Sequence, residues 1–161
     1  MTTARRSAGL LLYRRVGRAV EVLLVHPGGP FWAKRDDGAW SIPKGEFLAD
    51  EDPLAAALRE FAEELGSPPR VRGEPVPLRP VRQAGGKVVL AWAQEGDFEV
   101  DDLVSNTFEL EWPPRSGRRH LFPEVDRAGW FTLAQAREKL LEGQRPLLAQ
   151  LEQLRELGEA T

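Results

Sequence analysis

The segment DPLAAALREFAEELG, residues 52–66, constrains the fold more than any other part of the sequence. Asp52 suits the N-cap of a helix, Pro53 suits its first position, and Gly66 suits the left-handed residue after its end. At helical spacing, one stripe of this helix is apolar and consists of Leu54, Leu58, Phe61 and Leu65. The sequence therefore predicts a helix whose apolar stripe packs on a sheet.

The same helix clusters three carboxylates, those of Glu60, Glu63 and Glu64. Spacings of i,i+3 and i,i+4 place them on one arc beside the apolar stripe. Like charges at that spacing disfavour an exposed helix by about 0.2 to 0.5 kcal/mol per pair, and a cation would relieve the repulsion. Carboxylate oxygens are ligands that Mg²⁺ and Mn²⁺ prefer. Two interpretations stay open on the helix alone, a divalent metal site or a solvated acidic face.

The preceding segment, Trp40 to Glu46 (WSIPKGE), complements these carboxylates. Gly45 permits a sharp turn that would expose a backbone carbonyl as a further metal ligand. Lys44 would neutralise a phosphate oxygen in a site that otherwise repels anions. The alternative is an ordinary loop turn with an exposed lysine.

Length and composition limit the classes of protein that remain. The 161 residues suit one domain, here residues 1–161, and the net charge of -3 provides no global field for a polyanion. We therefore expect no stable nucleic-acid partner. No apolar run approaches the roughly 18 residues that span a bilayer, and no secretory signal is visible, so a soluble, cytoplasmic protein without a membrane partner is expected. With no cysteine, a metal would be held by oxygen or by His26 and His120.

Other segments predict a sheet and two closing helices. Strands are predicted over residues 7–15, 19–26, 88–93, 107–112 and 129–132, and helices over residues 134–141 and 146–157. An acidic segment around residues 95–102 would join the third and fourth strands. Residues 27–44 are rich in Gly, Pro and Trp, too irregular for a minimal turn, and are expected to line a pocket. The sheet is expected to be mixed.

The residues from Gly45 to Ser67 resemble the Nudix box, G-x5-E-x7-R-E-U-x-E-E-x-G-U, in which U is a bulky apolar residue. Eight of its nine specified positions match, namely Gly45, Glu51, Arg59, Glu60, Phe61, Glu63, Glu64 and Gly66. The departure is Ser67, which follows the helix cap and bears on local packing rather than on metal binding.

Resemblance to Nudix hydrolases implies an α/β/α sandwich with a mixed β-sheet, an α+β fold. It also implies that Glu60, Glu63, Glu64 and the carbonyl at or just before Gly45 bind Mg²⁺ or Mn²⁺. Arg59 and Glu51 would orient that cluster. The implied reaction is attack of an activated water on a diphosphate linked to another moiety. Glu63 and Glu60 are the leading candidates for the catalytic base, and Glu124 is a third candidate.

The substrate is a separate question. The W-x-x-P-K-G pattern resembles Nudix members that act on diadenosine polyphosphates, RNA caps and diphosphoinositol polyphosphates, so a small nucleotide or polyphosphate, best a dinucleoside polyphosphate or nucleoside triphosphate, is expected. Lys44 and Lys34, with Arg35, would hold phosphates. Trp40, Trp32 or Phe31 would stack on a base or else lie in the core. A basic loop at residues 118–120 would hold distal phosphates or be a solvated surface.

Two alternatives remain. The box does not exclude ADP-ribose, a nucleotide sugar or a damaged nucleotide as substrate. A non-catalytic Nudix ligand-binding module is the alternative from another class, and it predicts a damaged box or an appended DNA-binding domain, neither of which the sequence shows. The sequence does not encode the oligomeric state in any motif that we can identify.

Overall fold

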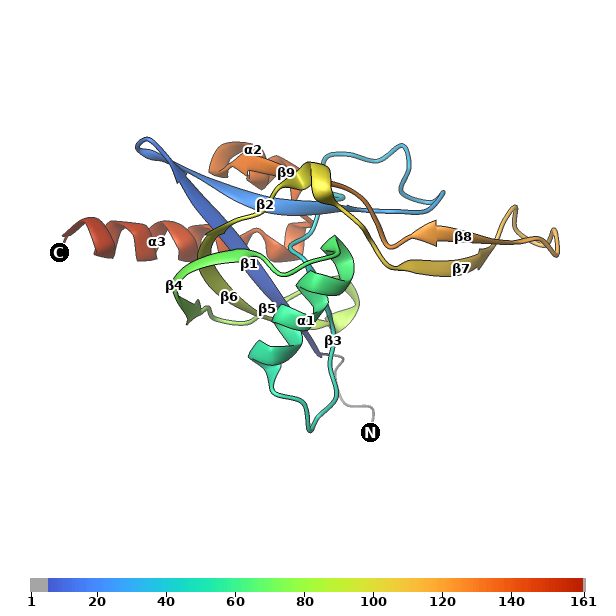
Figure 1. The fold of residues 1–161 in the computed structure, drawn as a ribbon, viewed down its shortest axis with the longest axis horizontal. Helices are drawn as coiled ribbons and strands as arrows, with labels where there is room; N and C mark the ends of the chain where they lie inside the picture. Colours follow the sequence, from blue (N-terminus) through green and yellow to red (C-terminus); the bar gives the residue numbers. More distant parts are fainter. Residues whose placement is uncertain (1–5, 161) are drawn as a thin grey trace.

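The computed structural model describes residues 6–160, with side chains to residue 155 (Figure 1). Among these residues, seven strands form one mixed sheet with the order β4-β6-β1-β2-β9, in which β3 also pairs with β1 and β5 with β6. Its strands are β1 (Arg6–Val16), β2 (Ala19–Pro27), β3 (Lys44–Glu46), β4 (Arg70–Pro77), β5 (Val81–Arg82), β6 (Val88–Asp97) and β9 (Val125–Thr132). Strand β6 runs parallel to β1, whereas β2, β3 and β9 pair antiparallel with their neighbours. The expectation of a mixed sheet is confirmed.

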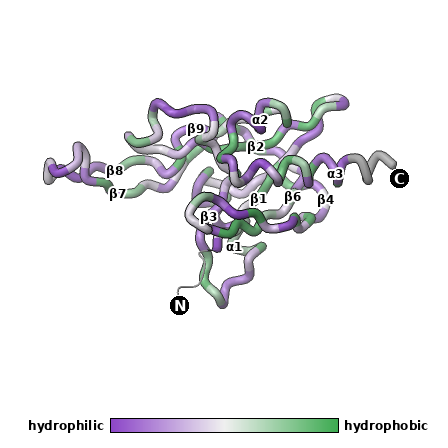
Figure 2. The backbone as a smooth tube through the Cα atoms, turned by 180° about the vertical axis from the view of Figure 1, so that it is seen from behind, coloured by the Kyte–Doolittle hydropathy of each residue, from purple (hydrophilic) through white to green (hydrophobic). Residues whose placement is uncertain are grey.

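The two faces of the sheet follow from the alternation of side chains along a strand. One face packs on α1 (Pro53–Leu65) through Leu10, Leu12, Leu23 and Val25. The other packs on α2 (Leu133–Lys139) and α3 (Pro146–Ala160) through Leu11, Val22 and Leu24. Helices thus cover both faces, and the predicted α/β/α sandwich is confirmed. Hydrophobic segments gather where α1, β1 and β6 meet (Figure 2).

Helix α1 begins and ends at the predicted residues. The carboxylate of Asp52 accepts a hydrogen bond from the Ala55 amide at 3.0 Å, and Gly66 adopts a left-handed φ of 95°. The predicted apolar stripe is wrong in part, because Leu58 is 38% exposed while Phe61 is fully buried.

The small side chains of α1 explain this difference. Ala56 and Ala57 are fully buried against Ala8 of β1. Residues without bulk beyond Cβ let the helix lie close to the strand. The resulting orientation of α1 turns Leu58 outwards and places Glu60 against Gly45 of β3.

Two further strands, β7 (Thr107–Glu111) and β8 (Arg119–Pro123), pair only with each other among the described residues. We call residues 107–123 the arm, because they extend away from the domain (Figure 1). The prediction of a basic loop at residues 118–120 is wrong for Arg119 and His120, which lie in β8. The strand predicted over residues 107–112 exists, but it belongs to the arm rather than to the main sheet.

Several elements differ from the sequence expectations. The acidic connection is shorter than expected, because β6 continues to Asp97 before a turn at Val100–Asp102. Strands β3, β4 and β5 carried no strong sequence signal, since two are very short and β4 contains a glycine and two prolines. No helix within residues 6–160 is long and apolar enough to cross a membrane.

Candidate active site

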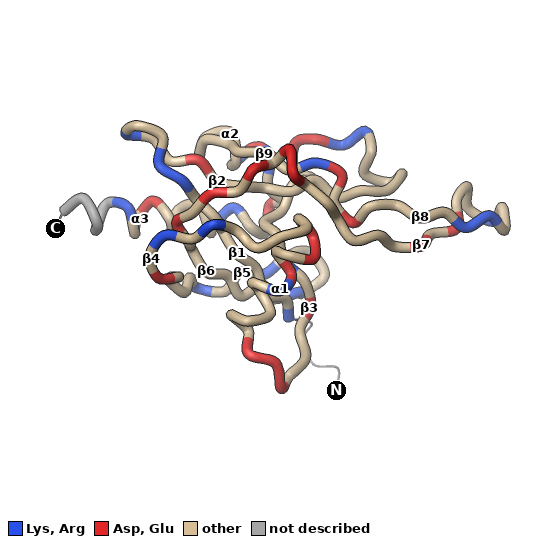
Figure 3. Tube along the Cα trace, in the orientation of Figure 1, with Lys and Arg blue, Asp and Glu red and all other residues tan. Residues whose placement is uncertain are grey.

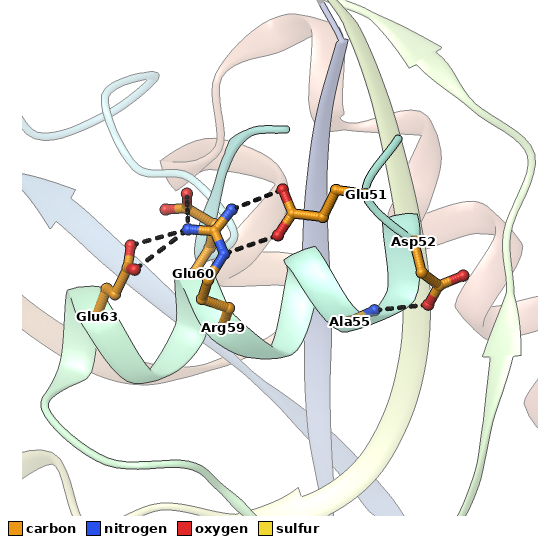
Figure 4. Close-up of polar contacts among 6 residues, drawn as sticks. All are labelled: Glu51, Asp52, Ala55, Arg59, Glu60 and Glu63. Carbon is orange, nitrogen blue, oxygen red and sulfur yellow. Dashed lines mark hydrogen bonds and ion pairs between the residues drawn. The ribbon is translucent and has the colours of Figure 1, made fainter. Parts of the chain in front are cut away.

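Arg59 is the centre of the ionic network on α1 (Figure 4). Its Nε and Nη2 donate to the two carboxylate oxygens of Glu51 at 2.9 and 3.1 Å. Its Nη1 donates to Glu60 at 3.0 Å and to both oxygens of Glu63 at 3.1 and 3.2 Å. One planar guanidinium therefore positions three glutamates, which agrees with the orienting role expected of Arg59 and Glu51.

Gly45 lies directly against the carboxylate of Glu60. Strand β3 pairs antiparallel with β1 and places Gly45 opposite Ala8. A Cβ atom at Gly45 would overlap the Glu60 carboxyl group. Burial raises the pKa of Glu60, while hydrogen bonding and attraction from Arg59 oppose that shift. The box glycine is therefore required here for contact between backbone and carboxylate, not for an unusual backbone conformation.

Glu64 and Lys44 form a second part of the site, and both residues are partly buried. Burial raises the pKa of Glu64 to about 8, repulsion by Glu60 adds to this, and Lys44 opposes it. Burial lowers the pKa of Lys44 to about 8, Lys87 contributes in the same direction, and Glu64 opposes it. The charges of the two groups thus interact, and a cation or a proton would neutralise the acidic side.

Glu124 joins the site through the backbone around Asn106. The Asn106 amide donates to the Glu63 carbonyl at 3.2 Å, and the Glu124 amide donates to the Asn106 carbonyl at 2.8 Å. This arrangement brings Glu124, far along the sequence, near the end of α1. Its charge raises the pKa values of both Glu60 and Glu64.

A cavity of about 210 Å³ lies between these groups and the loop that follows β2. Its lining residues are Val25, Pro27, Trp32, Ala39, Ser41, Ile42, Lys44, Glu64, Glu124, Val125 and Leu141. The prediction that residues 27–44 line a pocket is confirmed. The cavity places a lysine and two carboxylates around a space with mostly apolar walls.

The donor set suits a divalent cation that prefers oxygen. Among residues 6–155, no three His, Asp or Glu side chains converge as a formed metal centre, and Glu60 and Glu63 bond Arg59 instead. Three observations still fit Mg²⁺ or Mn²⁺: the carboxylates are hard ligands, Glu60 lies on the Gly45 backbone, and the Glu64 pKa is raised by burial among like charges. Rotation of Glu60 and Glu63 about their own side-chain bonds would release them from Arg59.

Gln144 holds the WSIPKG segment in place and was not found from the sequence. Its Oε1 accepts from the Ile42 amide at 3.0 Å, and its Nε2 donates to Ser41 Oγ at 2.9 Å. It lies fully buried in the short turn Glu142–Gln144 between α2 and α3. A single glutamine between two helices carries no recognisable signal.

Of the other predicted substrate residues, Trp32 lines the cavity, whereas Trp40 and Lys34 do not. Trp40 is 5% exposed, packs edge-to-face on Phe131 and donates its indole N–H to Asp36, so it is a core residue and the expectation of base stacking is wrong for it. Lys34 is exposed on the loop and does not line the cavity. Trp32 does line the cavity and has the Arg35 guanidinium 5.5 Å from its ring centre.

The two histidines are not arranged as metal ligands. His26 is fully buried, with Nδ1 2.7 Å from Asp126 Oδ1 and Nε2 2.6 Å from the Arg35 carbonyl. Both ring nitrogens are therefore engaged by oxygen acceptors. His120 lies on the arm, with its ring centre 6.3 Å from that of Phe122.

The α/β/α sandwich thus brings the arginine-held glutamates of α1 beside Gly45 of β3 and close to a cavity lined by Lys44, Glu64 and Glu124. A profile of the NUDIX domain matches residues 3–151, and the chain belongs to the NUDIX family.

Similarity to individual proteins agrees with this family. An RNA pyrophosphohydrolase of Gluconacetobacter diazotrophicus is 39% identical over 66 residues, which are 39% of this chain and 37% of that protein. The chain thus spans well under half the length of the curated relatives it matches. The structure of a Caenorhabditis elegans Ap4A hydrolase complex superposes with a TM-score of 0.60 at 21% identity, covering 93% of this chain and 98% of that one. A mutT/nudix family protein from Listeria innocua gives 0.63 at 15% identity over both full chains. These two likenesses concern the fold.

Proposed function

We propose that the protein is a pyrophosphohydrolase that depends on Mg²⁺ or Mn²⁺ and cleaves an anhydride in a nucleoside 5′-polyphosphate. This class includes nucleoside triphosphates, dinucleoside polyphosphates and the 5′-triphosphate end of RNA. The observation that carries the proposal is the grouping of Lys44, Glu64 and Glu124 around one cavity. The printed names of its relatives, RNA pyrophosphohydrolase and Ap4A hydrolase, support the nucleotide class.

Lys44 is the residue that we assign to the substrate phosphates. It lines the cavity, and its pKa of about 8 leaves the ammonium group protonated at neutral pH. A poorly hydrated ammonium group binds phosphate oxygens more strongly than one in bulk water. When bound, a divalent cation supplies charge screening for the polyphosphate and lowers the pKa of the attacking water.

Glu60, Glu64 and the Gly45 backbone are the groups that we assign to holding this cation, and Glu63 joins them when it leaves Arg59. Glu63 bonds Arg59 with both of its oxygens and is 40% exposed. Glu124 is exposed to solvent and lines the same cavity as the partly buried Glu64. We therefore place Glu124 ahead of Glu63 as the group that takes the proton from the attacking water.

The test is a screen of purified protein with Mg²⁺ or Mn²⁺ against dinucleoside polyphosphates, nucleoside triphosphates, 5′-triphosphate RNA, ADP-ribose and diphosphoinositol phosphates, with products identified by mass. We expect turnover of nucleoside 5′-polyphosphates that chelation abolishes. Glu124→Gln should lower kcat by about 10² to 10⁴, as expected when a general base is removed. Glu74→Gln is the matched control on the exposed strand β4, and it should retain full turnover.

Two results would overturn the proposal. Wild-type turnover in Glu64→Gln at saturating Mg²⁺ would show that the Glu64 carboxylate is not part of the site. Binding of nucleotides without turnover under every condition would assign the chain to the non-catalytic ligand-binding modules instead.

A further inference from the structure

The arm is the largest feature that the proposed function does not use. It leaves the domain at the end of the sheet where β2 finishes and β9 begins, which is also the end that holds the cavity (Figure 1). The Gly28 amide donates to the Glu124 carbonyl at 2.9 Å, directly after β8. The rings of Phe31 and Trp112 meet edge-to-face at 5.3 Å. The arm is therefore fixed to the loop that lines the cavity.

The outer end of the arm concentrates positive charge (Figure 3). Its three arginines are Arg115, Arg118 and Arg119, all exposed. Of the two glutamates of β7, Glu109 lies 3.7 Å from Arg119, and Glu111 accepts from the Gly117 amide at 2.8 Å. Within the part of the chain whose side chains are described, Arg115 and Arg118 have no ion pair. The end of the arm is mostly hydrophilic (Figure 2), and its exposed arginines are available to an anion.

Aromatic side chains lie along the arm and on the loop beside it. Phe31 is 62% exposed, and Trp112 and Phe122 are partly exposed. His120 lies beside Phe122 on the same strand. Cationic groups that neutralise phosphates, alternating with rings on which bases stack, are the features of surfaces that bind single-stranded nucleic acid.

The length of the arm decides what it can reach. A five-residue strand extends about 17 Å, so the arginines lie well beyond the phosphates of a mononucleotide held beside Glu64. A chain of several nucleotides with its 5′ end in the cavity would run along Phe31 and Trp112 to the arginines. A free nucleotide in the cavity would be too short to reach the arginines.

We propose that the arm, together with Phe31, binds the single-stranded RNA chain that follows the 5′-polyphosphate. This inference rests on the proposed function, since it names RNA as the substrate class that this site accepts. It departs from the sequence expectation of no nucleic-acid partner. That expectation used the net charge of -3, whereas the arm concentrates three arginines in five residues.

The first experiment measures binding separately from chemistry. The probe is a labelled, single-stranded RNA of about 12 nucleotides with a 5′-hydroxyl end, within the range of known site sizes, and fluorescence anisotropy gives Kd at several salt concentrations. Replacing Arg115, Arg118 and Arg119 together by alanine should weaken binding at least about tenfold. It should also lower the slope of log K against log salt by about 2, since each phosphate contact on a single strand contributes about 0.7.

The matched control replaces Arg70, Arg72 and Arg79 by alanine. These exposed arginines lie in or beside β4, at the opposite edge of the sheet from β9, and their removal changes the net charge equally. This variant should keep wild-type RNA affinity. Phe31→Ala should weaken binding without changing the salt slope, because it removes stacking and not charge.

Hydrolysis separates failure of this inference from failure of the proposed function. In the arm variant, kcat/KM should fall for 5′-triphosphate RNA and stay unchanged for ATP or a dinucleoside polyphosphate, which also shows that the variant is folded. RNA binding without hydrolysis of any substrate would contradict the proposed function and would still support the arm as an RNA-binding surface. Hydrolysis with equal RNA affinity in wild type and arm variant would overturn the inference. An altered mass in solution with unchanged RNA affinity would instead assign the arm to contact with a second copy of the chain.

Discussion

Arg59 and Glu51 meet through two parallel hydrogen bonds of 2.9 and 3.1 Å, although Glu51 lies before the helix that carries Arg59. The Arg59 side chain is 39% exposed, and exposed ion pairs contribute at most about 1 kcal/mol to stability. The pair therefore matters for the orientation of the Arg59 guanidinium rather than for stability. Glu51 fixes one edge of the guanidinium, which leaves Nη1 directed at Glu60 and Glu63.

Arg59→Lys tests this positioning role. An ammonium group keeps the charge but cannot bond Glu51 with two parallel contacts and reach Glu60 as well. We expect kcat to fall about 10²-fold, the loss typical of a displacement near 1 Å in a catalytic site, with a change in unfolding free energy below about 1 kcal/mol. Steady-state kinetics and urea unfolding measure the two quantities.

Arg137→Lys is the control for that exchange. Arg137 of α2 donates to Glu152 of α3 at 2.6 Å, on the other side of the sheet from α1. Its replacement should leave kcat unchanged. Equal losses in both variants would show that the exchange acts through folding rather than through the site.

Gly45→Ala should separate activity from stability. Gly45 has no left-handed backbone, so alanine is not strained there, but its methyl group would displace the Glu60 carboxylate. We expect kcat to fall about 10²-fold.

Gly38→Ala is the opposite case, because the φ angle of Gly38 is +74° and no atom lies near the added Cβ. It should cost about 1 to 2 kcal/mol of stability and leave kcat unchanged. A Gly45→Ala enzyme with normal kcat would contradict the contact.

The pKa of Glu64 gives a defined pH dependence of stability without metal. Its value is about 4.5 in the unfolded chain and about 8 in the folded protein. Between those values the folded state holds a proton that the unfolded state has released, so stability falls as pH rises, by up to about 1.4 kcal/mol per pH unit. Lys44 opposes this trend only near pH 8, because its pKa is about 8 in the folded protein and 10.5 in the unfolded chain, so only there does the folded state begin to release a proton that the unfolded state keeps.

Urea unfolding in EDTA from pH 5 to 8 should therefore show declining stability, and Glu64→Gln should flatten the decline. Added Mg²⁺ should restore stability most at pH 8, where the carboxylate gives up its proton most readily. Identical pH profiles for wild type and Glu64→Gln would show that Glu64 is not the group responsible.

Local sequence signals predicted the part of the site that lies on α1. The cap residues Asp52 and Gly66 act within one turn of the helix, so the ends of α1 follow from residue type. The β1–β2 hairpin follows from two apolar runs around Gly17. The orientation of the helix did not follow, because Ala56 and Ala57 determine it through contact with a distant strand.

Long-range contacts account for what the sequence did not reveal. Glu124 reaches the site through Asn106, which bonds both it and the end of α1. Gln144 bonds Ile42 across 102 residues. Trp40 lies beside a functional segment in sequence, yet it packs inwards on Phe131. In each case the position depends on tertiary packing, which neither periodicity nor spacing encodes.

The buried His26 gives a last prediction about the loop that lines the cavity. Its ring joins Asp126 of β9 to the Arg35 carbonyl in the loop, and Pro27 and Trp32 of that segment line the cavity. Asp126→Ala would leave Nδ1 buried without an acceptor, which costs about 1 to 3 kcal/mol. We expect lower stability together with a higher KM, because the loop loses its tether. Asp126→Asn keeps an acceptor oxygen and should show a smaller loss of stability and a smaller rise in KM.

Asp101→Ala is the control, because Asp101 is an exposed aspartate on the turn before β7, and this variant should match wild type. If Asp126→Ala lowered stability but left KM unchanged, His26 would be a structural residue with no part in shaping the cavity.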